Sequence, residues 1–143
     1  MRLNAQQWEA VKDIDRHVLV SASAGTGKTD TVVARVLHLL GVDLKGEPVP
    51  ADRRLTLRDI AAVTYTNAAA ADLKRKLREA LKTQGLREAA YQVDEARIGT
   101  IHAFCGSVLR EFALRLDRSP AREQLDDVQG EALRAECARD ALV

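Results

Sequence analysis

The sequence VLVSASAGTGKT, residues 18–29, decides the fold class. Its apolar start enters a loop of small residues, and Gly-Lys-Thr then opens a segment with helical periodicity. Small side chains let backbone N–H groups converge on phosphate oxygens, and the start of a helix adds partial positive charge. In such a loop the ammonium of Lys28 reaches the β- and γ-phosphates, while the Thr29 hydroxyl ligates Mg²⁺. The segment therefore predicts a phosphate-binding loop for a nucleotide.

The pattern assigns this chemistry to consecutive residues. Those expected to bind the nucleotide are Ser23, Ala24, Gly25, Thr26, Gly27, Lys28 and Thr29. Lys28 and Thr29 are the expected catalytic residues, and Thr29 is the expected Mg²⁺ ligand. The strict motif has glycine where Ala22 stands, and Gly-Lys-Thr at a helix start also occurs by chance. The expected strand before it, the helix after it and the small residues between them favour phosphate binding.

Apolar periodicity on both sides of the loop predicts alternating helices and strands. The expected helices cover residues 5–14, 29–40, 67–81, 101–116 and 123–143, and the expected strands cover residues 17–20, 60–64 and 97–99. Gly41 is the expected stop of the second helix, Asn67 the expected cap of the third, and residues 42–57 an expected surface excursion. This order predicts an α/β fold of the P-loop NTPase type, with a parallel sheet flanked by helices and a helical C-terminal segment.

The composition is that of a globular domain, because 46% of the residues are hydrophobic and 30% are charged. The net charge of +1 gives no overall attraction to a polyanion. Cys105 and Cys137 lack metal-binding spacing, and we expect both to be reduced helix residues in the core of a cytoplasmic protein. No apolar run approaches the roughly 18 residues of a membrane span, so no membrane partner is expected.

Three further motifs surround the loop. The amide of Gln7, in LNAQQ, matches the donor and acceptor on the edge of adenine. An aromatic, a hydroxyl and an amide follow the second expected strand, where they suit base stacking and phosphate contacts; they are Tyr65, Thr66 and Asn67. His102 opens the helix in IGTIHAFC. Plainer alternatives stay open: a surface role for Gln7, core packing for Tyr65, capping for Asn67 and a structural hydrogen bond for His102.

Together these motifs resemble, in order and spacing, the first motor domain of superfamily 1 helicases of the UvrD/Rep class. The Q motif, motif I, motif Ia and motif Ib of that class resemble LNAQQ, SASAGTGKT, VTYTNAAAADLKRKL and GTIHAFCGSVLREF. The stretches SASAGTGKT, TNAAAADL and TIHAFC are most similar to the AddA and RecB branch of ATP-dependent helicase–nucleases. The resemblance covers residues 3–112 and implies a RecA-like, ATP-binding fold that is incomplete in this chain.

The resemblance also implies roles for single residues. Gln7 is implied to contact the adenine base, and Arg35 matches a basic position on the helix after the phosphate loop. The residues implied to contact single-stranded DNA are Tyr65, Thr66, Asn67, Thr100 and His102. Asp30 stands where several relatives carry a nucleotide-contacting arginine. The helix after motif Ia carries basic residues that form either a DNA-tracking patch or a solvated face: Lys74, Arg75, Lys76, Arg78 and Lys82.

The implied domains are residues 1–118, the N-terminal part of a RecA-like motor domain, and residues 119–143, a helical segment leading into a truncated subdomain. Hydrolysis also needs an acidic pair at a strand end and an arginine. No apolar run of the sequence ends in Asp-Glu. We therefore expect an N-terminal portion of a helicase that ends before the Walker B strand.

The resulting prediction is the ATP-binding portion of an ATP-dependent DNA helicase that translocates on single-stranded DNA in repair or recombination. ATP and Mg²⁺ are the expected cofactors. The expected partners are single-stranded DNA and a second helicase–nuclease subunit. A non-catalytic nucleotide- or DNA-binding module that acts through a partner stays open as an alternative. A small P-loop kinase is a more distant one, because it leaves the motifs at Tyr65 and His102 unexplained.

Overall fold

The computed structural model of the chain describes residues 3–23, 25–121, 125 and 127–141. It divides into two compact units, Met1–Phe104 and Cys105–Val143. The expected position of Ala24 and the expected helical residues 123, 124, 126, 142 and 143 lie outside the described residues. The domain boundary after residue 118 stays a prediction.

The first unit contains helices and strands in an order that differs from the predicted strict alternation, because two helices precede each described strand. It contains α1 (Ala5–Lys12), α2 (Lys28–Leu39), β1 (Ala61–Thr64), α3 (Asn67–Thr83), α4 (Arg87–Tyr91), β2 (Arg97–Thr100) and the start of α5 (Ile101–Glu111), with 3₁₀ turns at Ala51–Arg53, Leu57–Asp59 and Gln92–Glu95. The second unit holds the rest of α5, a 3₁₀ turn at Ala113–Leu116 and α6 (Asp127–Asp140). The predicted α/β class is therefore confirmed for the described residues.

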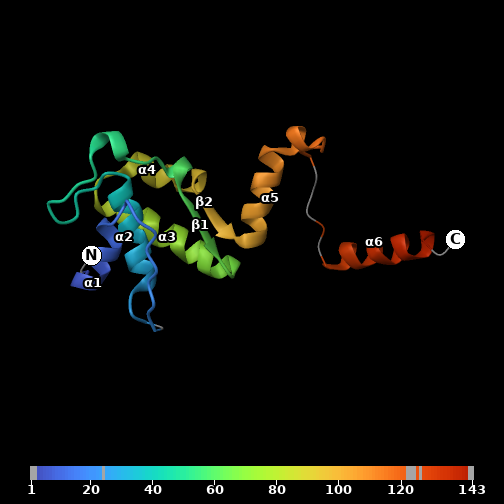
Figure 1. The fold of residues 1–143 in the computed structure, drawn as a ribbon, viewed down its shortest axis with the longest axis horizontal. Helices are drawn as coiled ribbons and strands as arrows, with labels where there is room; N and C mark the ends of the chain where they lie inside the picture. Colours follow the sequence, from blue (N-terminus) through green and yellow to red (C-terminus); the bar gives the residue numbers. More distant parts are fainter. Residues whose placement is uncertain (1–2, 24, 122–124, 126, 142–143) are drawn as a thin grey trace. The chain divides into compact units, whose positions relative to one another are not determined.

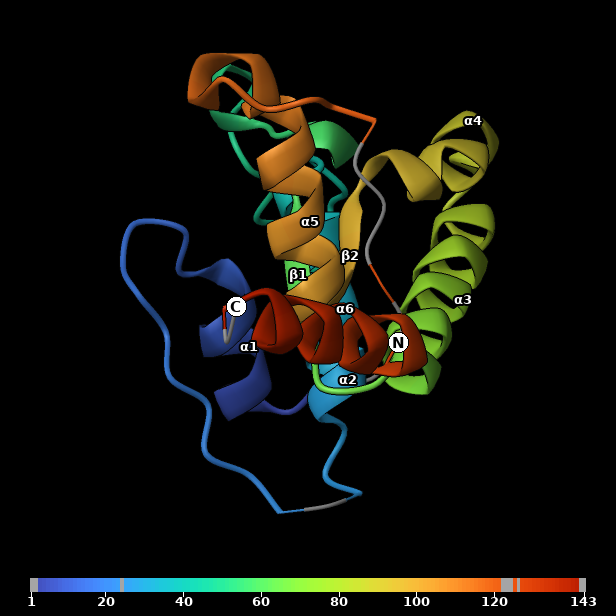
Figure 2. The ribbon, with the colours of Figure 1, turned by 90° about the vertical axis from the view of Figure 1, so that its right-hand side faces the viewer.

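The described sheet consists of β1 and β2, which run parallel and lie side by side (Figure 1, Figure 2). Their register pairs Ala61 with Arg97 and Thr64 with Thr100. Both strands therefore end at the same edge. Residues that follow them in the sequence are brought together there.

The core of the first unit forms where α2 and α3 pack with β2. α3 turns its residues Ala70, Leu73, Leu77 and Leu81 inward at spacings of three and four, which is the period of one helix face. Leu37 of α2 and Ile98 of β2 join this cluster. Leu37, Leu77 and Leu81 are almost fully buried. Each such side chain stabilises the fold by about 1.5–3 kcal/mol relative to leaving it exposed.

A smaller cluster fixes α1 against α2. Trp8 and Val11 of α1 pack on Ala34, and the Trp8 ring meets the buried His38 ring edge-on, with 5.5 Å between centroids. Burial, followed by the charge of Arg35, lowers the pKa of His38. The neutral imidazole therefore belongs to this interface, which holds α1 beside the helix that follows the phosphate loop.

Two glycines end helices as backbone chemistry requires. After α2, the N–H of Gly41 donates to His38 O and that of Val42 donates to Leu37 O, which is a Schellman motif. Gly41 has φ +89°, and a Cβ there would lie 2.5 Å from Arg54 Cδ. The predicted stop at Gly41 is confirmed. Gly85 ends α3 in the same manner, because the N–H of Gly85 donates to Lys82 O and that of Leu86 donates to Leu81 O.

The strand expected at residues 17–20 is wrong. This segment is irregular and runs apart from the two strands (Figure 2), and its Leu19 side chain is 95% exposed. A strand is held by ladder hydrogen bonds to a neighbour, and in the described part of the chain β1 pairs only with β2. Apolar composition alone does not supply such a neighbour.

Other expectations also need correction. Thr66, and not Asn67, caps α3: the Thr66 hydroxyl accepts a hydrogen bond from the N–H of Ala69 at 3.1 Å. Cys105 and Cys137 lie on helices but are exposed, so neither belongs to the core. The expected surface excursion at residues 42–57 is partly buried, because Val49 is 2% exposed and Leu57 joins the core cluster that contains Leu37 and Leu77.

Candidate nucleotide site and polar strand edge

Two glycines shape the loop between α1 and α2. Gly25 and Gly27 have φ +78° and +83°, which side chains rarely tolerate. Gly27 is the N-cap of α2, and its carbonyl accepts hydrogen bonds from the N–H and the hydroxyl of Thr31 at 2.9 and 3.0 Å. The loop therefore turns sharply into α2 and leaves Lys28 and Thr29 in the first turn of that helix.

The ammonium of Lys28 holds the loop together. Its Nζ donates to the carbonyl oxygens of Ala22 and Ser23 at 2.6 and 2.7 Å. The Thr26 hydroxyl donates to the same Ser23 carbonyl at 2.7 Å. These exposed bonds give Lys28 neutral oxygen partners. An anionic oxygen makes a stronger partner for an ammonium than a carbonyl does, so a phosphate can replace them.

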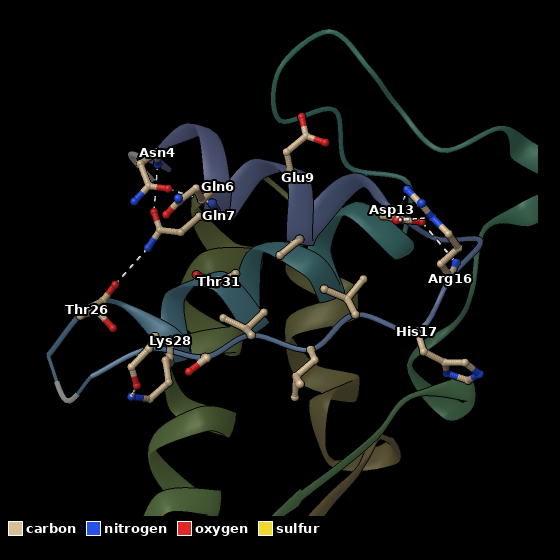
Figure 3. Close-up of a pocket in the computed structure, with 16 residues that line it drawn as sticks. Asn4, Gln6, Gln7, Glu9, Asp13, Arg16, His17, Thr26, Lys28 and Thr31 are labelled. Carbon is tan, nitrogen blue, oxygen red and sulfur yellow. Dashed lines mark hydrogen bonds and ion pairs between the residues drawn. The ribbon is translucent and has the colours of Figure 1, made fainter.

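Gln7 joins this loop to α1. Its Oε1 accepts from the N–H of Asn4 at 2.9 Å, and the Asn4 side chain accepts from the N–H of Gln7 at 2.8 Å, which forms a capping box. Its Nε2 donates to Thr26 O at 3.1 Å, across 19 positions of sequence (Figure 3). The structure thus brings together Gln7 and the predicted phosphate loop.

A cleft of about 810 Å³ lies beside this contact. Its lining comes from α1, from the irregular segment before the loop and from the start of α2, and it includes Gln7, Arg16, His17, Thr26, Lys28 and Thr31 (Figure 3). The cleft therefore has the size of small-molecule sites, and its lining combines these donor groups with the carboxylates of Glu9 and Asp13.

Arg35 lies farther along α2 than the loop. It stands seven residues after Lys28, which is about 10 Å along a helix axis. Its Nη1 donates to the carbonyl of Ala10, near the end of α1. In this structure Arg35 therefore fastens α2 to α1, and its expected contact with a nucleotide stays a prediction.

Asp30 has a cationic partner on another helix. Its Oδ1 lies 3.6 Å from Lys76 Nζ of α3, and the same Nζ lies 3.6 Å from Asp72 Oδ2. The pair joins the first turn of α2 to the helix that starts at the end of β1. Lys76 thus places a positive charge beside the acidic side chain of Asp30.

Polar side chains gather at the common edge where β1 and β2 end. Tyr65 is 99% exposed, which excludes the core-packing alternative for its ring. Thr66, Asn67 and His102 are also exposed. The hydroxyl of Thr100 accepts from the N–H of Ala103 at 3.3 Å. The structure therefore brings the five expected DNA contacts to one edge, and their binding role stays a prediction.

The basic residues of α3 are largely paired with acids. Lys74 and Arg78 both reach the Asp94 carboxylate, at 3.2 and 2.9 Å. Arg75 bonds Asp72 and Glu79, and its hydrogen bond holds the pKa of Asp72 below the usual value. Charge pairing of this kind favours the solvated-face alternative over a DNA-tracking patch.

Sequence reasoning missed the partners that organise these groups. Asn4 was available as a signal, because Asn-x-x-Gln at residues 4–7 has the spacing of a capping box. Asp94 had no such signal, since its role depends on the turn Gln92–Glu95 folding back beside α3. The burial of His38 is likewise a property of α1 packing on α2.

Two kinds of feature are absent from the described ranges. No helix in them is both long enough and apolar enough to cross a membrane. Nor do they contain a group of three or more His, Cys, Asp or Glu side chains placed to hold a metal ion.

Fold and site together define an α/β domain in which a glycine-rich loop opens a helix and is tied to the helix before it. Comparison of the sequence with known protein families identifies the family to which this α/β domain belongs. The chain matches the family of UvrD/REP helicase N-terminal domains over residues 3–141, and it belongs to that family. The resemblance drawn from the four sequence motifs is confirmed.

Individual proteins with similar sequences support the same family assignment. The chain is 35% identical over 135 residues to an ATP-dependent helicase/nuclease subunit of Bacillus licheniformis, and the match covers 89% of the chain and 10% of that relative. It is 35% identical over 144 residues to the protein of the same name from Bacillus anthracis, covering 95% and 11%. The chain spans about a tenth of the length of the curated relatives it matches.

Proposed function

We propose that this chain is the ATP-binding portion of an ATP-dependent DNA helicase that translocates on single-stranded DNA in repair or recombination. The observation that carries the proposal is the meeting of Gln7, Thr26 and Lys28 at one loop. An adenine-reading amide and a phosphate-binding ammonium are thereby within reach of one nucleotide. The names of the relatives, which include ATP dependence and helicase activity, support the same ligands.

In this proposal each part of the loop has a role. The residues that hold the nucleotide are Gln7, Ser23, Ala24, Gly25, Thr26, Gly27, Lys28, Thr29 and Arg35. Lys28 exchanges its two carbonyl partners for phosphate oxygens. The N–H groups at the start of α2 add hydrogen bonds and the positive end of the helix dipole.

Mg²⁺ fits the residues present. Thr29 is half-exposed in the first turn of α2, where its hydroxyl can reach an ion held by the phosphates. Mg²⁺ keeps several waters and needs few protein ligands when phosphates supply the others. When bound, the ion neutralises negative charge on the phosphates, and Thr29 positions it.

Single-stranded DNA is the proposed second ligand, at the edge where β1 and β2 end. The exposed ring of Tyr65 would stack on a base. The polar groups of Thr66, Asn67, Thr100 and His102 would contact sugar and phosphate. This assignment rests on the exposure and shared location of these side chains.

The proposal extends to the longer protein of which such a domain is a part. There it would act with a second helicase–nuclease subunit, in keeping with the word subunit in the names of the relatives. A cytoplasmic location belongs to the same proposal, because ATP and chromosomal DNA are found there. ATP hydrolysis also needs an acidic pair at the end of a strand. No apolar run of this sequence ends in Asp-Glu.

Thermal unfolding with and without ATP–Mg²⁺ tests the nucleotide site. At an ATP concentration 100 times Kd, binding should stabilise the fold by about 2.7 kcal/mol and raise Tm accordingly. Lys28→Ala should abolish this protection, while Lys82→Ala, an exposed lysine on α3, should retain it. Protection that survives Lys28→Ala would show that the phosphate-loop assignment is wrong.

A further inference from the structure

We propose that Gln7 is a positioning residue for the phosphate loop, in addition to its proposed contact with adenine. The inference rests on the proposed nucleotide function and deepens it. It assigns to one amide two tasks, reading the base and holding the backbone that binds the phosphates.

The contacts of Gln7 support the second task directly. Nε2 donates to Thr26 O at 3.1 Å, which is the carbonyl of the residue between Gly25 and Gly27. A Cβ built on Gly27 would lie 3.0 Å from the same Nε2. The amide therefore lies against the two peptide units that lead into α2. It favours glycine at position 27 by close approach as well as by backbone conformation.

The other end of the amide is fixed to α1. Oε1 accepts from the N–H of Asn4 at 2.9 Å, and the capping box orders the first turn of that helix. α1 is in turn held against α2 by the Trp8–His38 contact and by Arg35. Gln7 thus connects a packed pair of helices to a loop that otherwise holds itself through Lys28 and Thr26.

The hydrogen-bond capacity of an amide allows both tasks at once. A glutamine side chain has two N–H donors and two acceptor lone pairs. Thr26 O takes one donor and the N–H of Asn4 takes one lone pair. One donor and one lone pair remain, which is the set that an adenine edge requires. A base bound there would therefore also steady the bond to Thr26.

Binding of tripolyphosphate, a ligand without a base, separates the two tasks. The assay is calorimetric titration of the chain with ATP and with tripolyphosphate, both with Mg²⁺. If Gln7 holds the loop, Gln7→Met should lower the affinity for tripolyphosphate about 2- to 10-fold, the range of one lost hydrogen bond. The same change should lower the affinity for ATP by more, because the contact with the base is also lost.

Two variants serve as controls. Gln92→Met changes an exposed glutamine of the turn Gln92–Glu95, which does not line the cleft, and should leave both affinities within about 2-fold of the original protein. Asn4→Ala removes the side-chain half of the capping box but keeps the backbone N–H that binds Gln7, so it reports the effect of a loosened α1. Thermal unfolding of each variant checks that the fold is retained.

The outcomes are distinguishable. Loss of ATP affinity with unchanged tripolyphosphate affinity in Gln7→Met would limit Gln7 to the base and overturn the inference. An equal loss of tripolyphosphate affinity in Asn4→Ala would attribute the effect to α1 and also overturn it. If the unaltered chain binds neither ligand, the proposed nucleotide site itself fails.

Discussion

Replacing Tyr65 by alanine tests the proposed DNA edge with little effect on the fold. The ring is 99% exposed, so its removal deletes almost no packing. Base stacking on an aromatic side chain contributes about 1–3 kcal/mol. At about 1.4 kcal/mol per tenfold change, Tyr65→Ala should weaken binding of a single-stranded oligonucleotide about 5- to 150-fold.

The assay is fluorescence anisotropy with a labelled oligothymidine at several salt concentrations. Stacking is not an ionic contact, so the slope of log Kd against log salt should be the same before and after the change. Tyr91→Ala is the matched control, because Tyr91 is the other tyrosine of the chain and is 79% exposed on α4. Unchanged affinity in Tyr65→Ala, or an equal loss in Tyr91→Ala, would refute the stacking role.

Two further predictions concern buried and paired charges. Asp94→Asn should free Lys74 and Arg78 from their shared carboxylate and leave oligonucleotide binding and its salt dependence unchanged, as a solvated face requires; tighter binding with a steeper salt dependence would instead favour a DNA-tracking patch. The lowered pKa of His38 means that the unfolded chain takes up a proton before the folded chain as pH falls. The free energy of unfolding should therefore decrease as the pH drops below about 6.5, the pKa of histidine in the unfolded chain. Urea unfolding from about pH 7.5 to 5.5 should show this decrease, and His38→Leu should remove it.

The parts of the fold that the sequence predicts well are those with a local cause. α2 and α3 carry apolar residues at helical spacing, and a glycine at φ +89° ends α2 within one residue of the expected point. β1 follows from the mostly apolar run at residues 60–64, and both β1 and β2 lie within one residue of expectation. In each case the residues that determine the element lie inside or next to it.

The failures have causes that are remote in sequence. The segment at residues 17–20 has strand composition, but a strand needs a partner, and β1 pairs only with β2 among the described residues. The sequence left the basic residues of α3 open between a DNA-tracking patch and a solvated face, because Asp94, the acidic partner of Lys74 and Arg78, comes after the helix and reaches them only in the folded chain. For the candidate site, residue types were predictable from motifs, while the hydrogen-bond partners that are remote in sequence, such as Thr26 O for Gln7, were not.

The irregular backbone at residues 17–20 also bears on how the phosphate loop is held. A loop that leaves a paired strand inherits its position from the ladder, but here the residues before Ala22 are irregular and exposed. The loop is instead positioned by side chains, with Lys28 binding the carbonyls of Ala22 and Ser23 and Gln7 binding that of Thr26. Of these two contacts, a phosphate would displace the partners of Lys28 but not that of Gln7. The hydrogen bond from Gln7 to Thr26 O can therefore hold the loop in place while a nucleotide is bound. For this reason, removing the Gln7 amide should weaken the binding of a ligand that has no base.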